Sequence, residues 1–186
     1  VLSGGRIVAL AHKHHLPNYG VFDEKRLYAP GAISGPYRVG PVRIGSPICE
    51  DAWFPDVTET LAETGAEILL VPNGSPYHRD KFGQRLSLMV ARVVETGLPL
   101  VYLNMTGGQD DQVFDGGSFV LNRGGRLALQ MPVFDEALVH VDFVQTNEGW
   151  RAEEGERAVH PGPWEQDYRV MVESLRDYLA KSGFGK

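Results

Sequence analysis

The only cysteine of this 186-residue chain, Cys49, lies in a stretch whose residue types favour nucleophilic chemistry. Residues 42–45 before it have the composition of a short β-strand, and Asp56 with Glu59 after it has the spacing of a capping box that opens a helix. Cys49 is therefore predicted to lie where a strand passes into a helix. Backbone N–H groups and the positive end of that helix would favour the thiolate, the nucleophilic form of cysteine. The alternative is a small buried apolar side chain without a chemical role.

A cysteine that attacks a carboxamide needs a base to move protons and a positive group to stabilise the oxyanion. Lys13 is a candidate for the positive group. Residues 7–15 alternate as in a strand, which places Lys13 at its end on the side of the small residues Ala9 and Ala11. The alternative is an ordinary solvated surface lysine.

Three histidines, His12, His14 and His15, surround this lysine and allow two other interpretations. A metal site is disfavoured, because strand alternation divides the imidazoles between two faces and no acidic or cysteine ligand has a recognisable spacing. We therefore expect no metal. A Cys-His dyad with Cys49 stays open, since catalytic partners need not be close in sequence.

Composition narrows the functional classes. Hydrophobic residues make up 42% and aromatic residues 10% of the chain, as in ordinary folded proteins. The formal net charge of -6 gives no basic footprint for nucleic acid or an anionic membrane, and no apolar run is long enough to span a bilayer. A single cysteine excludes an intrachain disulfide and fits a reducing compartment. We expect a cytoplasmic protein that binds neither nucleic acid nor membrane.

The periodicity of apolar residues predicts an α/β fold in layers. Helices are predicted over residues 56–64, 79–96 and 164–181, the first two closed by Gly65 and Gly97. Strands are predicted over residues 7–10, 42–45, 67–71, 100–104, 118–121, 126–130 and 137–143, with a hairpin turn at 122–125. The polar segments 73–76 and 106–111 are expected to be loops that follow strands.

Both ends of the chain carry expectations about a longer protein. Residues 1–10 have the pattern of the second half of a β-hairpin with its turn at 3–5, and the first residue is not methionine, so we expect a part of a longer chain. Residues 146–163 are polar and rich in glycine and proline, which is typical of a linker. The helix over 164–181 has one apolar stripe and is expected to open a second domain; the stripe is formed by Trp164, Tyr168, Met171, Val172, Leu175, Tyr178 and Leu179.

Several blocks of sequence, taken together and in this order, resemble one known family. They are residues 13–26 (KHHLPNYGVFDEKR), 48–53 (ICEDAW), 73–76 (NGSP), 107–110 (GGQD) and 113–116 (VFDG). These blocks are similar to those of the glutaminase domain of glutamine-dependent NAD synthetases, which belongs to the nitrilase superfamily. The resemblance covers nearly the whole chain and implies a nitrilase-like αββα sandwich whose N-terminal part is missing here.

The resemblance implies roles for six residues. Cys49 matches the family's nucleophile and Lys13 its catalytic lysine. The positions that contact glutamine in the family are matched by Tyr19, Ser75 and Lys81, and a supporting glutamate of nitrilase-like enzymes is matched by Glu24. Without the resemblance, these last four would be a loop aromatic, a turn former, a helix-surface charge and part of a solvated charge run.

The sequence departs from the family at both ends. The family's triad is Glu-Lys-Cys, and its glutamate, the general base, is expected upstream of Val1. The ATP-binding pyrophosphatase motif is expected beyond Lys186. The implied division is a glutaminase domain over 1–145, incomplete at its N-terminus, a linker over 146–163 and the start of an NAD synthetase domain over 164–186. ATP and Mg²⁺ are expected in that synthetase domain, with no cofactor in this chain and no activity of this chain alone.

The function implied by the resemblance is hydrolysis of L-glutamine, with the ammonia used for ATP-dependent amidation of deamido-NAD to NAD. A homo-oligomer is expected, because nitrilase-like domains usually pair through their surfaces. One alternative is a stand-alone nitrilase-like amidase that hydrolyses another small amide, which the helix over 164–181 disfavours. The other is a catalytically inactive lobe that serves only as an assembly surface, which the joint presence of Cys49, Lys13 and Tyr19 disfavours.

Overall fold

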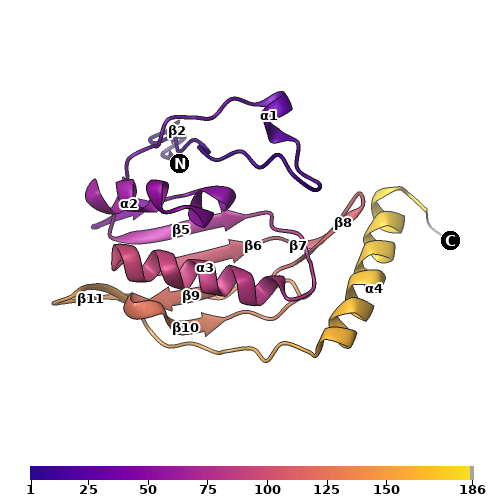
Figure 1. Cartoon of the computed structure of the whole chain (residues 1–186). Coiled ribbons are helices and arrows are strands. Elements are labelled where there is room, and N and C mark those ends of the chain that lie inside the picture. Colours follow the sequence, from indigo (N-terminus) through magenta and orange to yellow (C-terminus); the bar gives the residue numbers. More distant parts are fainter. Residues whose placement is uncertain (185–186) are drawn as a thin grey trace.

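The computed structural model describes residues 1–184, which contain one six-stranded sheet with the strand order β10-β9-β6-β5-β4-β3 (Figure 1). Its strands are β3 (Tyr37–Val39), β4 (Val42–Gly45), β5 (Ile68–Asn73), β6 (Leu100–Asn104), β9 (Phe119–Asn122) and β10 (Arg126–Gln130). Strands β4, β5 and β6 run parallel, and the other three join antiparallel at the two edges. The predicted hairpin of β9 and β10 is confirmed, with the short 3₁₀ helix η2 (Arg123–Gly125) in its turn.

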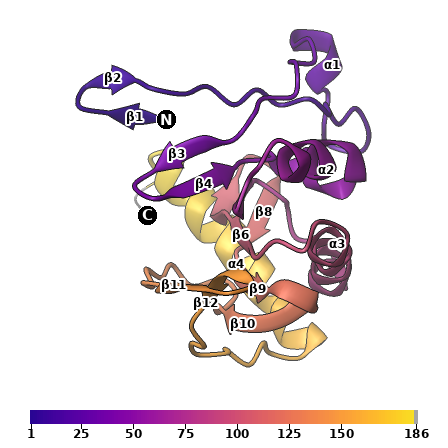
Figure 2. The same cartoon turned by 90° about the vertical axis from the view of Figure 1, so that its left-hand side faces the viewer.

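Two helices, α2 (Pro55–Glu63) and α3 (Lys81–Thr96), cover one face of this sheet (Figures 1 and 2). Each leads from the carboxyl end of one parallel strand to the start of the next, as a parallel pair requires. The main apolar core lies between these helices and the sheet. Its side chains with at most 1% exposure include Leu69, Val71, Met89, Val93, Leu100, Tyr102 and Leu121. The predicted α/β class is confirmed.

The helix boundaries show which local signals were correct. The predicted end of α3 is confirmed, because Gly97 has φ 68° and terminates the helix in the left-handed region. The predicted capping box of Asp56 and Glu59 is wrong. Helix α2 begins one residue earlier, at Pro55, and the Asp56 carboxylate accepts hydrogen bonds from the neighbouring Val57 N–H and from His15.

The first residues of the chain form a complete small hairpin, in which β1 (Leu2–Ser3) pairs with β2 (Arg6–Ile7). The expectation of only the second half of a hairpin is therefore wrong. The strand predicted over 7–10 is also wrong, because residues 8–18 belong to no strand. The one-turn helix α1 (Glu24–Leu27) follows.

Individual hydrogen bonds replace a strand ladder around Lys13. The N–H groups of His14 and His15 both donate to the carboxylate of Asp51, and the Lys13 carbonyl accepts from the N–H of Gly31. These partners come from distant parts of the chain. A pattern of alternating residues cannot distinguish such a segment from a strand, which explains the error.

Two further hairpins differ from the predictions. The segment predicted as a loop, residues 106–111, contains β7 (Thr106–Gln109), which pairs antiparallel with the following strand β8 (Gln112–Asp115). The strand predicted over 137–143 is wrong: β11 (Phe143–Thr146) begins at its last residue and pairs with β12 (Gly149–Ala152). The Thr146 side chain stabilises the turn by accepting from Glu148 N–H and donating to the Gly149 carbonyl.

The first part of the segment predicted as a linker packs against the sheet. Ala152 at the end of β12 is fully buried, and the side chain of Asn122 forms hydrogen bonds to both its N–H and its carbonyl, at 2.8 and 2.9 Å. Gln130 and Arg157 form an isolated β-bridge further along. The domain boundaries at 145 and 163 stay predictions.

The last helix, α4 (Pro163–Lys181), is confirmed and lies beside the β7–β8 hairpin (Figure 1). It contacts this hairpin through Val170, which packs against the cluster that includes Val113 of β8, and through polar side chains. Asp177 accepts a hydrogen bond from the N–H of Gly108 at 2.7 Å, and Lys181 donates to the Gly108 carbonyl. The residues of the predicted apolar stripe that are more than half exposed are Trp164, Tyr168, Met171, Leu175 and Tyr178.

None of the helices within residues 1–184 combines the length and the apolar character needed to cross a membrane.

Core packing makes the first testable prediction. Leu69 of β5 is completely buried, whereas Leu138 is 87% exposed. Leu69→Ala is expected to lower the free energy of unfolding by about 2–5 kcal/mol, because it removes apolar contacts and leaves a cavity. Leu138→Ala is expected to change it by less than about 0.5 kcal/mol. Urea unfolding followed by tryptophan fluorescence measures both, and equal effects would contradict the described core.

Candidate active site

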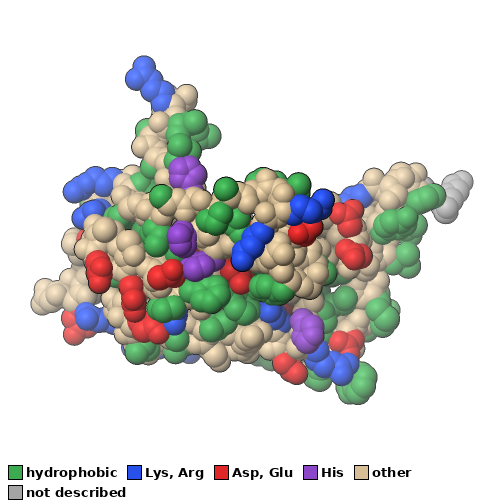
Figure 3. All heavy atoms as spheres, turned by 45° about the horizontal axis from the view of Figure 1, so that its top comes forward, with side chains coloured by type: hydrophobic (Ala, Val, Ile, Leu, Met, Phe, Trp, Pro, Cys, Tyr) green, Lys and Arg blue, Asp and Glu red, His purple; other side chains and the backbone are tan. Residues whose placement is uncertain are grey.

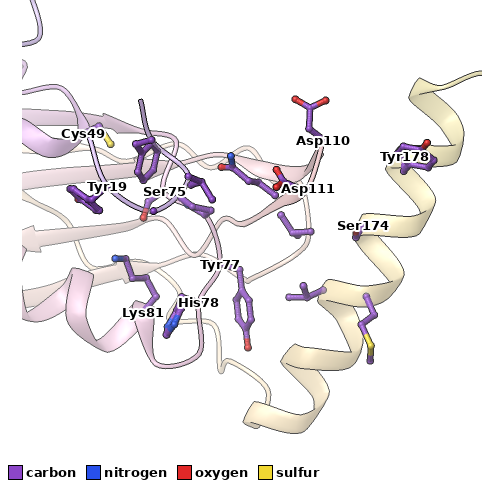
Figure 4. Close-up of a pocket in the computed structure, with 18 of the residues that line it drawn as sticks. Tyr19, Cys49, Ser75, Tyr77, His78, Lys81, Asp110, Asp111, Ser174 and Tyr178 are labelled. Atoms are coloured by element: carbon purple, nitrogen blue, oxygen red, sulfur yellow. The ribbon is translucent and has the colours of Figure 1, made fainter. Parts of the chain in front are cut away.

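Cys49 is the first residue of the 3₁₀ helix η1 (Cys49–Trp53), which lies between β4 and α2. The predicted position between a strand and a helix is confirmed. Its φ of 51° is in the left-handed region, where residues other than glycine are uncommon and which is often found at functional sites. The side chain lines a cavity at the carboxyl end of the parallel strands (Figure 4).

Burial raises the pKa of the Cys49 thiol above its ordinary value. The positive charge of Lys13 and the N–H groups of Gly74 and Glu50 lower this pKa, but they do not outweigh the loss of solvation. The expected effect of backbone N–H groups, which favour the thiolate, is present, but burial outweighs it and the net pKa is raised. A 3₁₀ helix of one short turn carries only a small dipole to oppose desolvation.

Lys13 forms a bidentate contact with Glu24. Its Nζ lies 2.6 and 2.7 Å from the two carboxylate oxygens, and the side chains are only 19% and 26% exposed. Glu24 is the first residue of α1. The irregular segment between Lys13 and α1 folds back so that the two side chains meet. The contact fixes the direction of the ammonium group and gives it a counter-charge.

The cavity beside Cys49 has a volume of about 770 Å³. Its walls come from the loop around Tyr19, the segment after β5, the tips of β7 and β8, and α4 (Figure 4). The three residues that the resemblance assigns to glutamine all line it, namely Tyr19, Ser75 and Lys81. Lys13 and Glu24 are not part of the lining, although the charge of Lys13 acts on Cys49.

Tyr19 is held by a carboxylate that sequence reasoning did not single out. Its hydroxyl donates to both oxygens of Glu50, each at 2.9 Å, and Glu50 is only 8% exposed. Burial and this hydrogen bond raise the pKa of Tyr19, so the hydroxyl stays protonated and acts as a donor. The position of Glu50 directly after Cys49 was the one sequence signal for it.

Ser75 is held by a buried polar network centred on Arg85 of α3. The guanidinium donates to Ser75 Oγ at 3.0 Å, to the Ser75 carbonyl at 2.8 Å and to both carboxylate oxygens of Asp115 at 2.8 and 2.9 Å. The side-chain oxygen of Asn104 accepts from the Ser75 N–H at 2.9 Å. The loop that carries Ser75 is therefore held by hydrogen bonds to α3 through Arg85 and to β6 through Asn104.

Arg85 and Asp115 were missed because charged residues usually lie in solvent. They are 1% and 2% exposed. One signal was present: Arg85 lies three residues after Phe82 and four before Met89, so it shares the apolar face of α3. A charge on that face needs a buried partner.

Lys81 lies against an aromatic ring. Its Nζ is 4.4 Å from the centroid of the Trp53 ring, which is cation-π geometry. Burial lowers the pKa of Lys81, and the nearby charge of Arg85 adds to this effect. No carboxylate forms a salt bridge with Lys81 within the described residues, so its charge is available to an anionic group of a ligand.

The histidines near Lys13 have other partners. His14 Nδ1 lies 2.7 Å from the Gly31 carbonyl, and His15 Nε2 lies 2.8 Å from Asp56. The two rings make an edge contact at 4.9 Å, so the predicted separation on two strand faces is wrong. Ligand atoms of His14, His15 and Asp56 lie within 4.8 Å of one another, yet the hydrogen bonds already account for this cluster. His12 is exposed.

Fold and site together define a class of protein: an α/β protein whose cysteine lines a cavity at the carboxyl end of parallel strands, near a lysine that is paired with a glutamate. The model of the carbon-nitrogen hydrolase family matches residues 1–152, and the chain belongs to this family. The predicted resemblance to the nitrilase superfamily and its fold is thereby confirmed.

Similar proteins show which members of the family this chain resembles. The chain is 58% identical over 186 residues to the glutamine-dependent NAD(+) synthetase of Rhodobacter capsulatus, covering 100% of this chain and 34% of the relative. The structure of glutamine-dependent NAD+ synthetase from Acinetobacter baumannii superimposes with a TM-score of 0.91 and 36% identity, covering 98% of this chain and 34% of that one. An amidase of Nesterenkonia sp. AN1 gives a TM-score of 0.56 and 30% identity, covering 68% of this chain and 48% of that one. The chain thus spans about a third of the length of the synthetases that it matches.

The Cys49 pKa gives a prediction that needs no substrate. Iodoacetamide reacts with the thiolate, so the pH midpoint of Cys49 alkylation is expected above about 8.5, the pKa of a free cysteine. Lys13→Met is expected to raise the midpoint further, because it removes a positive charge that lowers the pKa. Lys25→Met, at an exposed position of α1, is the matched control and is expected to leave the midpoint unchanged. A midpoint in Lys13→Met at or below that of the native protein contradicts the described geometry.

The buried ion pair of Arg85 and Asp115 gives a third prediction. Arg85→Met is expected to cost about 3–5 kcal/mol, because it leaves the Asp115 carboxylate buried without its counter-ion. Burial already raises the pKa of Asp115 while Arg85 opposes the rise, so the variant raises this pKa further. Asp115 of the folded variant then binds a proton more tightly than Asp115 of the unfolded chain. The loss in free energy of unfolding caused by Arg85→Met is therefore expected to become smaller as the pH falls.

Urea unfolding at pH 8 and pH 5 tests this dependence. The double variant Arg85→Met/Asp115→Leu is the control. Because it removes both charges, it is expected to be more stable than Arg85→Met alone and to lack the extra dependence on pH. A loss in Arg85→Met that is the same at both pH values would show that the guanidinium acts only by packing.

Proposed function

We propose that this chain is the glutaminase part of a glutamine-hydrolysing NAD(+) synthetase. The observation that carries the proposal is one cavity, in which Cys49 lies together with Tyr19, Ser75 and Lys81, the three residues expected to contact glutamine. The synthetases of Rhodobacter capsulatus and Acinetobacter baumannii, which match over nearly the whole chain, support it.

The proposed chemistry begins when Cys49 loses its proton to a base and its sulfur attacks the side-chain amide carbon of glutamine. The negative charge that develops on the amide oxygen is stabilised by the Lys13 ammonium. The carbon–nitrogen bond then breaks, the nitrogen takes up a proton, and ammonia leaves a γ-glutamyl thioester on the sulfur. Water attacks the thioester, which releases glutamate and restores the thiol.

Glu24 fits the supporting role in this scheme. Both of its oxygens already accept from Lys13, so it orients the ammonium group. The base is proposed to be the triad glutamate that the resemblance places upstream of residue 1. Because burial raises the pKa of Cys49, the reaction depends on such a base.

The walls of the cavity suit an α-amino acid. Glutamine carries an α-carboxylate and an α-ammonium, and the cavity offers the ammonium of Lys81 and the carboxylate of Glu50. Ser75 and Tyr19 add polar atoms whose positions are fixed by Arg85 and Glu50. We propose that these groups orient the amide end toward Cys49.

In the intact protein, the ammonia is proposed to reach a synthetase domain that binds ATP, Mg²⁺ and deamido-NAD and forms NAD. The boundaries proposed for this chain are the glutaminase domain at 1–145, the linker at 146–163 and the beginning of the synthetase domain at 164–186. We also propose a cytoplasmic homo-oligomer, as in the sequence-based expectation.

A stand-alone amidase is the second candidate, and the likeness to the amidase of Nesterenkonia sp. AN1 favours it. The higher identity to the Rhodobacter synthetase and the larger coverage of this chain weigh against it. Relative rates of hydrolysis of glutamine and of simple aliphatic amides by the intact protein separate the two.

The function is tested with Cys49→Ala in the intact protein. The variant is expected to lose ammonia release from glutamine and glutamine-dependent NAD formation, while NAD formation from added ammonium chloride and deamido-NAD persists within about twofold. The reason is that only the first reaction needs the thiolate. Release of glutamate and formation of NAD are measured together. Retained glutamine hydrolysis, or loss of the ammonium-dependent reaction as well, would contradict the proposal.

A further inference from the structure

Asp51 is a buried carboxylate that takes no part in the proposed reaction. Its side chain is 1% exposed, and within residues 1–184 its hydrogen bonds come from backbone N–H groups rather than from a cationic side chain. Burying a charge is costly unless hydrogen bonds replace its water. Here backbone N–H groups replace the water around the carboxylate. These groups belong to two separate segments of the chain, which Asp51 therefore connects.

The carboxylate links two segments that are distant in sequence. Its Oδ1 accepts from the two N–H groups that follow Lys13, at 3.0 and 2.7 Å, and its Oδ2 accepts from the N–H of Ile48 at 3.0 Å. Ile48 directly precedes Cys49. One side chain therefore joins the backbone beside the lysine to the backbone beside the thiol.

Local helix capping does not explain this arrangement. The bond to Ile48 is of the kind by which an acidic residue stabilises the first turn of a helix. The other two bonds, to His14 and His15, span 37 and 36 positions of the chain. They contribute nothing to a cap.

The lysine segment has further hydrogen bonds, to Gly31, Ser34 and Glu24, but none of these partners lies in the turn at Cys49. Residues 8–18 belong to no strand, so no ladder fixes them against the turn at Cys49. Two side-chain contacts also connect this part of the chain to the residues from Cys49 onward: the pair of His15 and Asp56, in which the carboxylate is 48% exposed, and the hydrogen bonds of Tyr19 to Glu50. Exposed pairs stabilise a structure only slightly. Asp51 differs from both contacts because its buried carboxylate bonds directly to the backbone next to Lys13 and next to Cys49.

We propose that Asp51 is a positioning residue that sets the separation of the Lys13 ammonium and the Cys49 sulfur. The inference rests on the proposed glutaminase function, in which the ammonium must reach the oxyanion formed on the carbon that the sulfur attacks. Oxyanion donors act over about 3 Å, and a displacement of about 1 Å removes much of their effect. Asp51 acts through Lys13 and does not touch the substrate.

Asp51→Asn is the informative variant, because it keeps the size of the side chain. An amide has one oxygen, so its NH₂ group must face an N–H group of one of the two segments, and the link to that segment is lost. Asp56→Asn is the matched control. It makes the same chemical change at the exposed carboxylate that contacts the lysine segment, and it is expected to alter every rate by less than about twofold.

Steady-state kinetics of the intact protein give the first test. Asp51→Asn is expected to lower kcat for glutamine hydrolysis at least about tenfold, with KM changed less than about threefold, because an oxyanion donor acts in the transition state. In a Lys13→Met background the same change is expected to lower kcat by less than about threefold further. An equal loss in both backgrounds, or a loss carried by KM, overturns the proposal.

Alkylation of Cys49 by iodoacetamide gives a second test that needs no glutamine. Lys13→Met raises the pH midpoint of alkylation when Asp51 is present, and is expected to shift it much less in the Asp51→Asn background, since the ammonium is no longer held beside the sulfur. The same shift in both backgrounds overturns the positioning role. If the intact protein does not hydrolyse glutamine, the proposed function fails while this test of Asp51 still stands.

If Asp51→Asn does not fold, hydrogen exchange of the native protein still tests the proposal. The amides of His14 and His15 are expected to exchange as slowly as those of the central strands, although they belong to no strand. Exchange as fast as that of the amides of residues 9–11, which donate no hydrogen bond within the described part of the chain, overturns the proposal.

Discussion

The buried guanidinium of Arg85 is the constraint on which the shape of the cavity depends. A cation that is 1% exposed must have its donors satisfied inside the protein, and here they bond to Asp115, to the side chain and carbonyl of Ser75 and to the carbonyl of Pro76. The contact therefore joins α3, β8 and the loop after β5 at one point. Any movement of that loop would leave a buried charge without its partners. This cost keeps the floor of the cavity rigid.

The other walls follow from the order of strands in the sheet. Strands β4, β5 and β6 run parallel, so the turn at Cys49, the loop with Ser75 and the start of the β7–β8 hairpin all lie at one edge. Ligand sites of open parallel sheets occur at this edge. Helix α4 adds an outer wall. Its Val170 packs against an apolar cluster that includes Val113, and Tyr77 donates to Asp167 at 2.9 Å, which connects the helix to the same loop. Burial and this bond raise the pKa of Tyr77 to about 12.

Sequence reasoning succeeded where a local rule coincides with the tertiary structure. The position of Cys49 after a strand, the end of α3 at Gly97 and the course of α4 each follow from a turn signal or from an apolar period. It failed where distant side chains decide the local conformation. The Lys13 segment has the alternation of a strand but is held by the carboxylate of Asp51, and the pairing of Arg85 appears only once the fold brings α3 close to the end of β8. Such bonds leave no periodic trace in a sequence.

The direction of the Cys49 pKa has a consequence for the chemistry. A buried thiol whose pKa is raised rests in its protonated form, which is inert toward weak electrophiles and spares the protein side reactions. Lys13 lowers this pKa without outweighing burial, and the carboxylate of Glu50 on the other side raises it. The effect of Lys13 on this pKa is larger than that of Glu50, and desolvation outweighs both. In the proposed reaction, the Lys13 ammonium would stabilise the oxyanion of the transition state more than the thiolate of the resting enzyme. An interaction that is stronger in the transition state than in the ground state accelerates a reaction.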